Sequence, residues 1–323
     1  MMSHLSKSRP ETLDWFTALS RLEGAYADET LRAYRADIAT FVTWAEERRY
    51  APFPAHPEMI AAFVRKQAET HASSTIKRRL AALNKIHRLL RVDNSVDDEE
   101  VRLALRRAYR QKKSRPSQAK GLTSDIRDKL LDACLNDLSG KRNKAIISVG
   151  YDTLARRSEL INVDFDDITI LPDGFGQIII RRAKNDQLGM GRIASITPHT
   201  IETINQWLQA ANISEGPIFR SLKNQKISSS RIHPSSVNRI LKQVATSAKL
   251  DRNIINSLSG HSMRVGAAQD MMANGIQLMS IMAAGGWKTI NVVARYVENT
   301  NINEIMKDFH QRLRLKKPHI KIN

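Results

Sequence analysis

The sequence predicts a mostly α-helical protein with a small antiparallel β-sheet. An all-helical N-terminal domain is expected ahead of an α+β C-terminal domain. Apolar residues recur at three- and four-residue steps through most of the 323 residues, which is typical of helices packed on a core. Between residues 112 and 122 the chain turns to Lys, Arg, Ser, Pro and Gln, as a basic linker does. Beyond it, two short segments rich in β-branched residues interrupt the helical pattern.

The composition indicates a folded and strongly basic protein. Apolar residues make up 41% of the chain, and 51 Lys and Arg against 33 Asp and Glu give a formal net charge of +18. A polyanion is the natural partner of such a surface, nucleic acid before an anionic membrane, although a merely soluble basic protein would look similar. The single cysteine, the polar N-terminus and the lack of a long apolar run favour a cytoplasmic protein that does not bind a membrane.

The N-terminal domain, residues 1–111, is expected to hold four helices. The first spans residues 31–45, Pro57 opens the second, Ser74 caps the third, and Leu105 lies in the fourth. The outer faces of the last two helices are basic, with few acids between the basic residues. Such a run is usually a solvated face, but the scarcity of acids favours contact with DNA phosphates. The residues concerned are Lys77, Arg78, Arg79 and Lys85 on the third helix and Arg106, Arg107 and Arg110 on the fourth.

The C-terminal domain, residues 123–323, is expected to begin with helices at 124–136 and 141–153. Residues 177–181 and 192–196 are predicted to pair as antiparallel strands, with an Asp-Gly turn at 173–174 before them. Further helices are expected at 198–211, 235–248, 263–274, 278–284 and 302–313. The helix at 235–248 is a candidate for the major groove of DNA, through Ser235, Asn238, Arg239 and Lys242.

Two features of this domain are weak signals when each is taken alone. Arg156 and Glu159 are three residues apart, so they would meet on one helical face, as an ordinary surface ion pair also does. Lys184 lies in the connection between the two predicted strands, from which a flexible ammonium can reach a buried substrate. Exposed lysines are common in such hairpins, so Lys184 has an equally ordinary explanation.

Two further features carry more chemical information. His261 and Arg264 share a face at the start of a helix, where anions bind readily and Arg264 adds a bidentate phosphate donor. No second His, Cys or acid is spaced for a metal ligand set, so no metal is expected there. Tyr296, which has a nucleophilic hydroxyl, follows nine residues after Trp287, which has an indole N–H donor. The alternative is that both are aromatic residues of the core.

Taken together, these residues resemble the tyrosine recombinase (phage integrase) family and are most similar to its Cre-like branch. The order is an arginine, a lysine on a β-hairpin, His-x-x-Arg, a tryptophan and a tyrosine. The similarity is strongest in Gly-His-Ser-Met-Arg-Val-Gly-Ala-Ala at 260–268 and in Ala-Gly-Gly-Trp at 284–287. It extends more faintly into the helical N-terminal domain and so covers most of the chain.

The resemblance implies a site-specific recombinase that cleaves and rejoins DNA through a 3′-phosphotyrosyl intermediate on Tyr296 and a Holliday junction. Arg156 and Arg264 would stabilise the charge on the non-bridging phosphate oxygens. Lys184 would protonate the departing 5′-oxygen as general acid. Because the phosphotyrosyl bond conserves the energy of the broken linkage, neither ATP nor a metal cofactor is expected.

The resemblance also implies supporting roles and an assembly. His261 would accept or position the Tyr296 proton, Trp287 would bind a phosphate oxygen, and Glu159 would support Arg156 or His261. The two domains would form a clamp around double-stranded DNA, and a homotetramer would hold two inverted-repeat target sites. The last helix would pack into a neighbouring protomer, or fold back on its own domain, through an apolar stripe formed by Ile305, Met306 and Phe309.

Two alternatives are open, a second enzyme and a protein of another functional class. A type IB topoisomerase uses similar residues, but the separate basic helical domain and the final helix favour recombination. A DNA-binding protein that has lost catalysis is the second alternative. The complete set of candidate catalytic residues argues against that reading.

Overall fold

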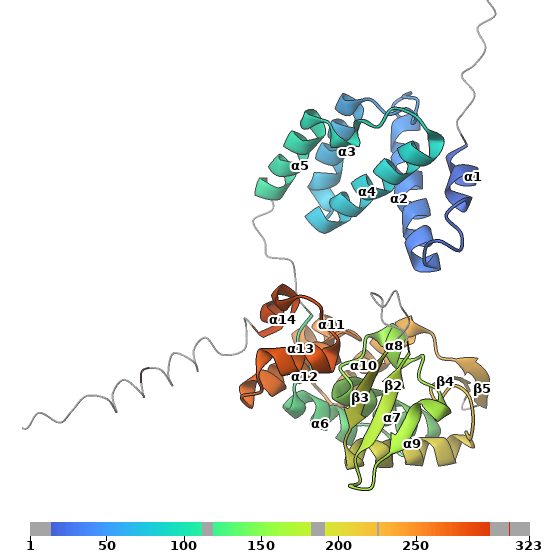
Figure 1. The fold of residues 1–323 in the computed structure, drawn as a ribbon, viewed down its shortest axis with the longest axis vertical. Coiled ribbons are helices and arrows are strands. Elements are labelled where there is room, and N and C mark those ends of the chain that lie inside the picture. The colour runs from blue at the N-terminus through green and yellow to red at the C-terminus, as the bar shows by residue number, and fades with distance from the viewer. Residues whose placement is uncertain (1–13, 112–118, 182–190, 225, 298–309, 311–323) are drawn as a thin grey trace, which may run out of the picture. The chain divides into compact units, whose positions relative to one another are not determined.

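The computed structural model describes residues 14–111, 119–181, 191–224, 226–297 and 310. The chain divides into two compact units, Met1–Ser117 and Gln118–Asn323, and each is described by itself. The predicted fold class is confirmed, because helices dominate both units and the strands form small antiparallel sheets (Figure 1). In the part of the chain that the structure describes, no helix combines the length and apolar character needed to span a membrane.

The first unit consists of helices alone. Its elements are α1 (Trp15–Ser20), α2 (Asp28–Glu46), α3 (Pro57–Thr70), α4 (Ser73–Leu90), a 3₁₀ turn η1 (Ser95–Asp97) and α5 (Glu99–Gln111). The four helices expected from the sequence are all present. Helix α3 packs on α5 and α2 packs on α4, around a core that includes Phe41, Ile60, Phe63 and Leu83.

The start of α4 differs from the sequence prediction. We expected Ser74 to be the N-cap, but α4 begins at Ser73 and its N-cap is Ala72, which offers no capping side chain. Most of the apolar residues of α4 are buried in the core of this unit. Packing rather than a side-chain cap therefore stabilises this helix.

The second unit is built around two small sheets and nine helices of its described residues. The elements up to the second sheet are α6 (Ser124–Asp132), α7 (Leu138–Asp152), α8 (Arg157–Leu160), η2 (Phe165–Asp167), β1 (Ile168–Ile170), β2 (Gly176–Ile180), β3 (Arg192–Ile196), α9 (Pro198–Ala211), β4 (Arg220–Lys223) and β5 (Lys226–Arg231). The remaining ones are α10 (Pro234–Ser247), α11 (Arg252–Ser257), α12 (Ser262–Ala273), α13 (Leu278–Gly285) and α14 (Ile290–Val297).

The first sheet has the strand order β1-β2-β3, and both pairs are antiparallel. Strands β2 and β3 match the two predicted strands, and Gly174, with φ of +84°, forms the expected turn before β2. Strand β1 and the separate β4–β5 hairpin were not predicted from the sequence. In the register of β2 and β3, Ile180 pairs with Arg192, so the connection that holds Lys184 leaves the sheet beside Arg192.

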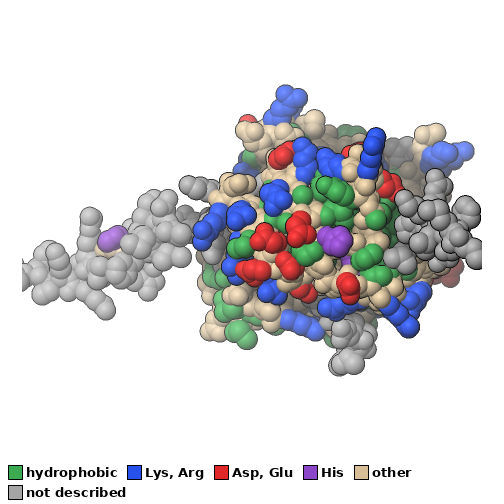
Figure 2. All heavy atoms as spheres, turned by 90° about the horizontal axis from the view of Figure 1, so that it is seen from above, with side chains coloured by type: hydrophobic (Ala, Val, Ile, Leu, Met, Phe, Trp, Pro, Cys, Tyr) green, Lys and Arg blue, Asp and Glu red, His purple; other side chains and the backbone are tan. Residues whose placement is uncertain are grey.

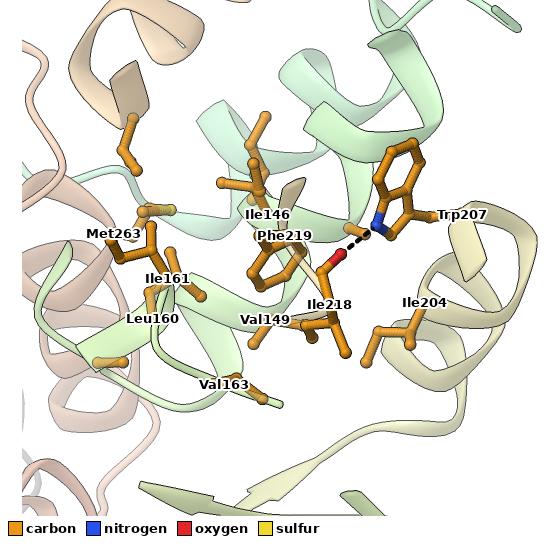
Figure 3. Packing of buried hydrophobic residues seen from close by; sticks show 14 of the residues in the cluster. Ile146, Val149, Leu160, Ile161, Val163, Ile204, Trp207, Ile218, Phe219 and Met263 are labelled. Carbon is orange, nitrogen blue, oxygen red and sulfur yellow. Dashed lines mark hydrogen bonds between the residues drawn. The ribbon is translucent and has the colours of Figure 1, made fainter. Parts of the chain in front are cut away.

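The core of the second unit surrounds α7, which packs along α9. Ile146 and Val149 of α7 lie near Phe219 and Ile218, and the indole Nε1 of Trp207 donates a 2.7 Å hydrogen bond to the Ile218 carbonyl (Figure 3). Because α7 is buried along most of its length, its C-terminal end is held firmly. The chain that leaves this end carries Arg156.

Helices α12, α13 and α14 form a smaller packing unit. Their apolar contacts join Ala268, Ile281 and Val293 with Trp287 and with Leu154 from the end of α7. Helix α14, which carries Tyr296, was not predicted from the sequence. Of the helix expected at 302–313 only residue 310 is described, and Ile305, Met306 and Phe309 lie outside the described residues.

Candidate active site

Arg156 is the N-cap of α8, and Glu159 is the third residue of that helix. One carboxylate oxygen of Glu159 accepts a 3.0 Å hydrogen bond from the Arg156 backbone N–H, and the other accepts one from the Arg156 guanidinium. Glu159 is buried, whereas a quarter of the Arg156 side chain remains exposed. The buried carboxylate therefore orients the guanidinium and leaves part of it accessible to a substrate.

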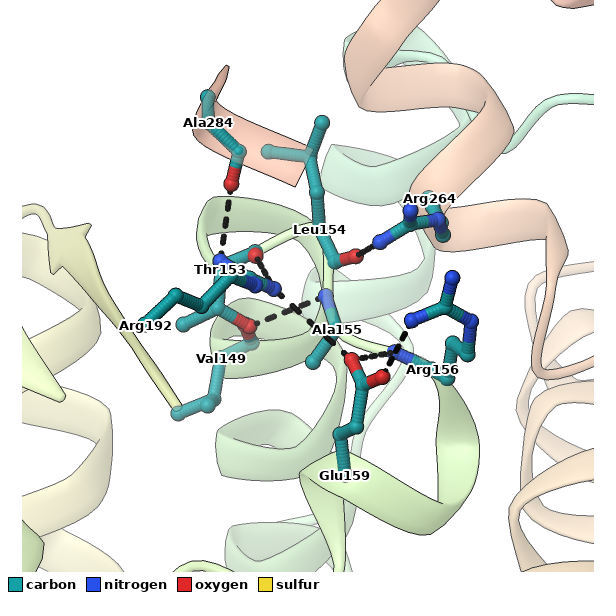
Figure 4. A network of polar contacts seen from close by, with 9 residues as sticks. All are labelled: Val149, Thr153, Leu154, Ala155, Arg156, Glu159, Arg192, Arg264 and Ala284. Atoms are coloured by element: carbon teal, nitrogen blue, oxygen red, sulfur yellow. Dashed lines mark hydrogen bonds and ion pairs between the residues drawn. The ribbon is translucent and has the colours of Figure 1, made fainter. Parts of the chain in front are cut away.

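Arg264 lies on α12 and is only 1% exposed. Its Nη1 donates to the Leu154 carbonyl (Figure 4). Its guanidinium carbon lies 3.9 Å from the centre of the Trp287 ring. Among the described residues, no acceptor pairs with the buried Nη2. Burial lowers the pKa of Arg264 to about 9, and the nearby charge of Arg156 acts in the same direction. A buried, incompletely paired cation of this kind is suited to bind an anion.

His261 and Tyr296 contact each other directly. The Nε2 atom of His261 lies 2.8 Å from the Tyr296 hydroxyl, and the two rings meet edge to face. Burial lowers the pKa of His261 to about 4, with Arg264 and Arg156 adding to the shift. Burial also raises the pKa of Tyr296, against the opposing charges of the two arginines. At neutral pH the phenol is therefore protonated and the imidazole is neutral, and a hydrogen bond joins the two.

This arrangement predicts the protonation state of His261 in the DNA-free protein. Because its pKa is depressed, the imidazole should stay neutral from pH 8 down to about pH 5, while an exposed histidine titrates near 6.5. The unfolded chain binds a proton at His261 near pH 6.5, whereas the folded protein does so only near pH 4. The free energy of unfolding that His261 contributes is therefore complete above pH 6.5 and is lost as the pH falls toward 4. NMR titration of labelled imidazoles, with His261→Gln to assign the signal, measures it; a midpoint near 6.5 would contradict the site as described.

Two glycines allow Trp287 to take its place in the site. Gly286 ends α13 with φ of +64°, a conformation that favours glycine, and its N–H bonds back to the helix. A Cβ on Gly285 would lie 2.1 Å from an atom of the Trp287 ring, so only glycine lets the indole pack against α13. The ring centres of Trp287 and Tyr296 are 5.8 Å apart. The position of Trp287 therefore requires glycine at both preceding residues.

The backbone of Tyr296 is also held in place. The side-chain amide of Gln269 donates a 3.0 Å hydrogen bond to the Tyr296 carbonyl. Gln269 lies on α12, five residues after Arg264, and was not predicted from the sequence. Gly266 of the same helix lets the segment around Leu122 approach closely, because a Cβ there would lie 1.9 Å from the Leu122 carbonyl oxygen. Helix α12 is thus the element on which the site is assembled.

The described residues bring six of the seven candidate catalytic residues together. The exception, Lys184, lies outside the described residues, and only the ends of its connection are placed, by β2 and β3. The site combines two arginines, a neutral histidine and a protonated tyrosine. Its chemistry is therefore suited to bind an anionic phosphate and to attack it with a phenol oxygen.

Comparison with known proteins identifies the family. The model of the phage integrase family matches residues 120–302, and that of the SAM-like N-terminal domain of phage integrases matches residues 13–94. The chain belongs to the phage integrase family, the tyrosine recombinases. This recombinase is 31% identical over 303 residues to an integrase/recombinase xerD homologue of Selenomonas ruminantium, covering 88% of this chain and 86% of the relative.

Other relatives agree with this assignment. The Cre recombinase of Escherichia phage P1 is 26% identical over 292 residues, which cover 85% of each chain. The fold also matches that of the XerH site-specific recombinase bound to a palindromic difH substrate, with a TM-score of 0.64, 16% identity, and coverage of 88% and 80% of the two chains. The protein is a site-specific DNA recombinase, and the phosphotyrosyl mechanism is general to its family.

The candidate DNA contacts on α4 of the recombinase differ in accessibility. Lys77 is exposed, and about half of the Arg78 side chain is exposed. Arg78 donates 2.8 Å and 2.9 Å hydrogen bonds to the two carboxylate oxygens of buried Asp37 on α2. Arg79 is largely buried against the same carboxylate. Arg79 therefore helps to hold α4 on α2, and phosphate contact is more natural for Lys77 and Arg78.

The other basic candidates of the first unit lie on its surface. Arg106, Arg107 and Arg110 are exposed on α5, and Lys85 lies over the ring of Tyr26, 5.1 Å from its centre. Figure 2 shows one face of the molecule on which acidic side chains gather among Lys and Arg side chains. Acidic and basic side chains are therefore mixed on this face.

Helix α10 carries the candidate base-reading residues of the recombinase. Ser235, Arg239 and Lys242 are exposed on it. Asn238 is half-buried, and its side-chain oxygen accepts a 2.7 Å hydrogen bond from the Gly260 N–H. Because Gly260 directly precedes His261, Asn238 supports the loop that positions the histidine. The sequence pattern gave no sign of this contact.

Proposed function

We propose that the recombinase cleaves DNA by attack of the Tyr296 hydroxyl oxygen on the scissile phosphate. The bond from phosphorus to the 5′-oxygen breaks as the bond to the tyrosine oxygen forms, leaving a 3′-phosphotyrosyl link and a free 5′-hydroxyl. The Tyr296 proton passes to Nε2 of His261, and Lys184 protonates the departing 5′-oxygen. Arg156 and Arg264 stabilise the charge that develops on the non-bridging oxygens.

The observation that carries this proposal is an unpaired cationic nitrogen beside a tyrosine that contacts a histidine. The buried Nη2 of Arg264 has no acceptor among the described residues, and the Tyr296 hydroxyl lies 2.8 Å from Nε2 of the neutral His261. A phosphate oxygen placed on Arg264 would give this nitrogen an acceptor. Because the tyrosine ester conserves the bond energy, the reverse attack by a 5′-hydroxyl from a partner strand rejoins DNA without ATP.

The proposal extends to the assembly. Two protomers bind the inverted repeats of one target site, each closing its two units around the duplex as a clamp, and four protomers synapse two sites. Lys77, Arg78 and the exposed arginines of α5 contact phosphates, while Ser235, Arg239 and Lys242 face the major groove. The apolar stripe of Ile305, Met306 and Phe309 joins neighbouring protomers. The reaction takes place in the cytoplasm, on double-stranded DNA.

Selection of bound DNA from a random library tests this function. The expected result is an inverted repeat around a short spacer, because paired protomers related by a two-fold axis bind related half-sites. Two copies of the selected site on one plasmid should then yield recombined circles. A motif without symmetry, or relaxed circles without recombined product, would favour the topoisomerase alternative instead.

A further inference from the structure

Arg192 is a buried arginine beside the active site that the proposed mechanism does not use. It is the first residue of β3, and 13% of its side chain is exposed. Its Nη1 donates a 2.8 Å hydrogen bond to the Ala284 carbonyl, and its Nη2 donates a 2.7 Å hydrogen bond to the Thr153 carbonyl (Figure 4). Nη2 also lies 4.0 Å from a carboxylate oxygen of Glu159.

The two carbonyls belong to the C-terminal ends of two helices. Thr153 is the C-cap of α7, and Ala284 lies in the last turn of α13. Carbonyls at these positions have no partner within their own helix, and the helix dipole favours a cation near them. One planar guanidinium therefore completes both helix ends at once and fixes their separation.

Both helix ends lead directly to catalytic groups. Thr153 lies three residues before Arg156, and Ala284 lies three residues before Trp287. Gly286 strengthens the contact, because a Cβ there would lie 3.0 Å from Cδ of Arg192, so the stem of the arginine packs on the turn that ends α13. Helix α14 with Tyr296 follows this turn and packs on α13.

We propose that Arg192 is a positioning residue for DNA cleavage. It holds α13, and through it Trp287 and Tyr296, against the loop that carries Arg156. The inference rests on the proposed role of Tyr296 as the nucleophile. A displacement of the attacking oxygen by about 1 Å can cost on the order of 100-fold in rate, so a contact outside the reacting atoms can control cleavage.

The test compares Arg192→Gln with Arg231→Gln in the full-length protein. Arg231 is a matched control, because it also binds a backbone carbonyl, that of Ile161, and a carboxylate, that of Asp164, within the second unit. On saturating DNA, Arg192→Gln should slow formation of the covalent adduct by about 10- to 100-fold with unchanged DNA affinity. Arg231→Gln should lower the melting temperature without slowing cleavage.

A substrate with a bridging sulfur at the 5′ position separates two explanations. Sulfur leaves without protonation, so it compensates for a displaced Lys184 but not for a displaced Tyr296. The loss in Arg192→Gln should therefore be equal on the oxygen and sulfur substrates, whereas Lys184→Ala should be rescued by sulfur. Full rescue of Arg192→Gln by sulfur would overturn the inference, because it would show that Arg192 positions Lys184 instead of Tyr296.

A conservative variant provides a control in case Arg192→Gln does not fold. Arg192→Lys keeps the charge but lacks the planar fork, so it should cleave more slowly than the parent and faster than a folded Arg192→Gln. A parental rate in either folded variant would overturn the inference. Failure of the proposed function is distinguishable, because it would appear as an adduct in Tyr296→Phe, whatever the behaviour of Arg192.

Discussion

Replacing Tyr296 with phenylalanine should abolish the covalent protein–DNA adduct and leave DNA affinity unchanged. Phenylalanine keeps the ring that packs near Trp287 and His261 and removes only the hydroxyl, which lies 2.8 Å from Nε2 of His261. Without this oxygen the site has no phenol nucleophile, so the loss should be complete. Denaturing gel analysis on a nicked suicide substrate carrying the selected target site measures the adduct.

Tyr151→Phe is the matched control for this substitution. Tyr151 is a half-buried tyrosine of the same unit whose hydroxyl donates to Asp270, so its removal also deletes one side-chain hydrogen bond. This variant should be less stable but should still form the adduct. A normal adduct level in Tyr296→Phe would show that another residue is the nucleophile.

Replacing Arg264 with alanine should have the second largest effect, a loss of cleavage rate of about 10³-fold. The guanidinium is buried over Trp287, and its Nη2 has no acceptor among the described residues, so a bound phosphate is its natural partner. Its loss removes charge stabilisation that is needed most when the phosphate is under attack. Single-turnover cleavage at saturating DNA measures the effect.

Arg127→Ala is the control for Arg264. Arg127 also places its guanidinium over an aromatic ring, that of Tyr151, at 4.5 Å, and it lies on α6 rather than on α12. Its loss should lower stability without an effect of comparable size on cleavage. An equal reduction of the rate in both variants would mean that the loss of Arg264 acts through folding, which would contradict its proposed role at the phosphate.

The sequence predicted elements well where local signals agreed. Helix α9 has the predicted bounds, because Thr197 caps it, Pro198 occupies its first position and its apolar residues share one face. Strand β5, with the sequence Lys-Ile-Ser-Ser-Ser-Arg, carries almost no apolar alternation and is held by pairing with β4. Strand β1 has only three residues. Such segments are strands because of their partners, which a periodicity argument does not detect.

The candidate site was also predicted only in part. The candidate catalytic residues could be identified through the resemblance, because their spacing and local sequence are specific. The residues that hold them in place were missed, since their contacts join distant parts of the chain: Arg192 binds Ala284, and Asn238 binds the Gly260 N–H. Arg79 was predicted to contact DNA phosphates, but its side chain is largely buried and paired with Asp37. Tertiary contacts of this kind leave no periodic trace in a sequence.

Mass spectrometry of the adduct tests the central claim most directly. The parent protein is trapped on a suicide substrate, the DNA is trimmed with nuclease, and the complex is digested with trypsin. Because Arg295 precedes Tyr296 and Lys307 follows, the tryptic peptide 296–307 should carry a nucleotide through its 3′-phosphate on the tyrosine. A nucleotide on any other residue, or one attached through a 5′-phosphate, would contradict the proposed mechanism.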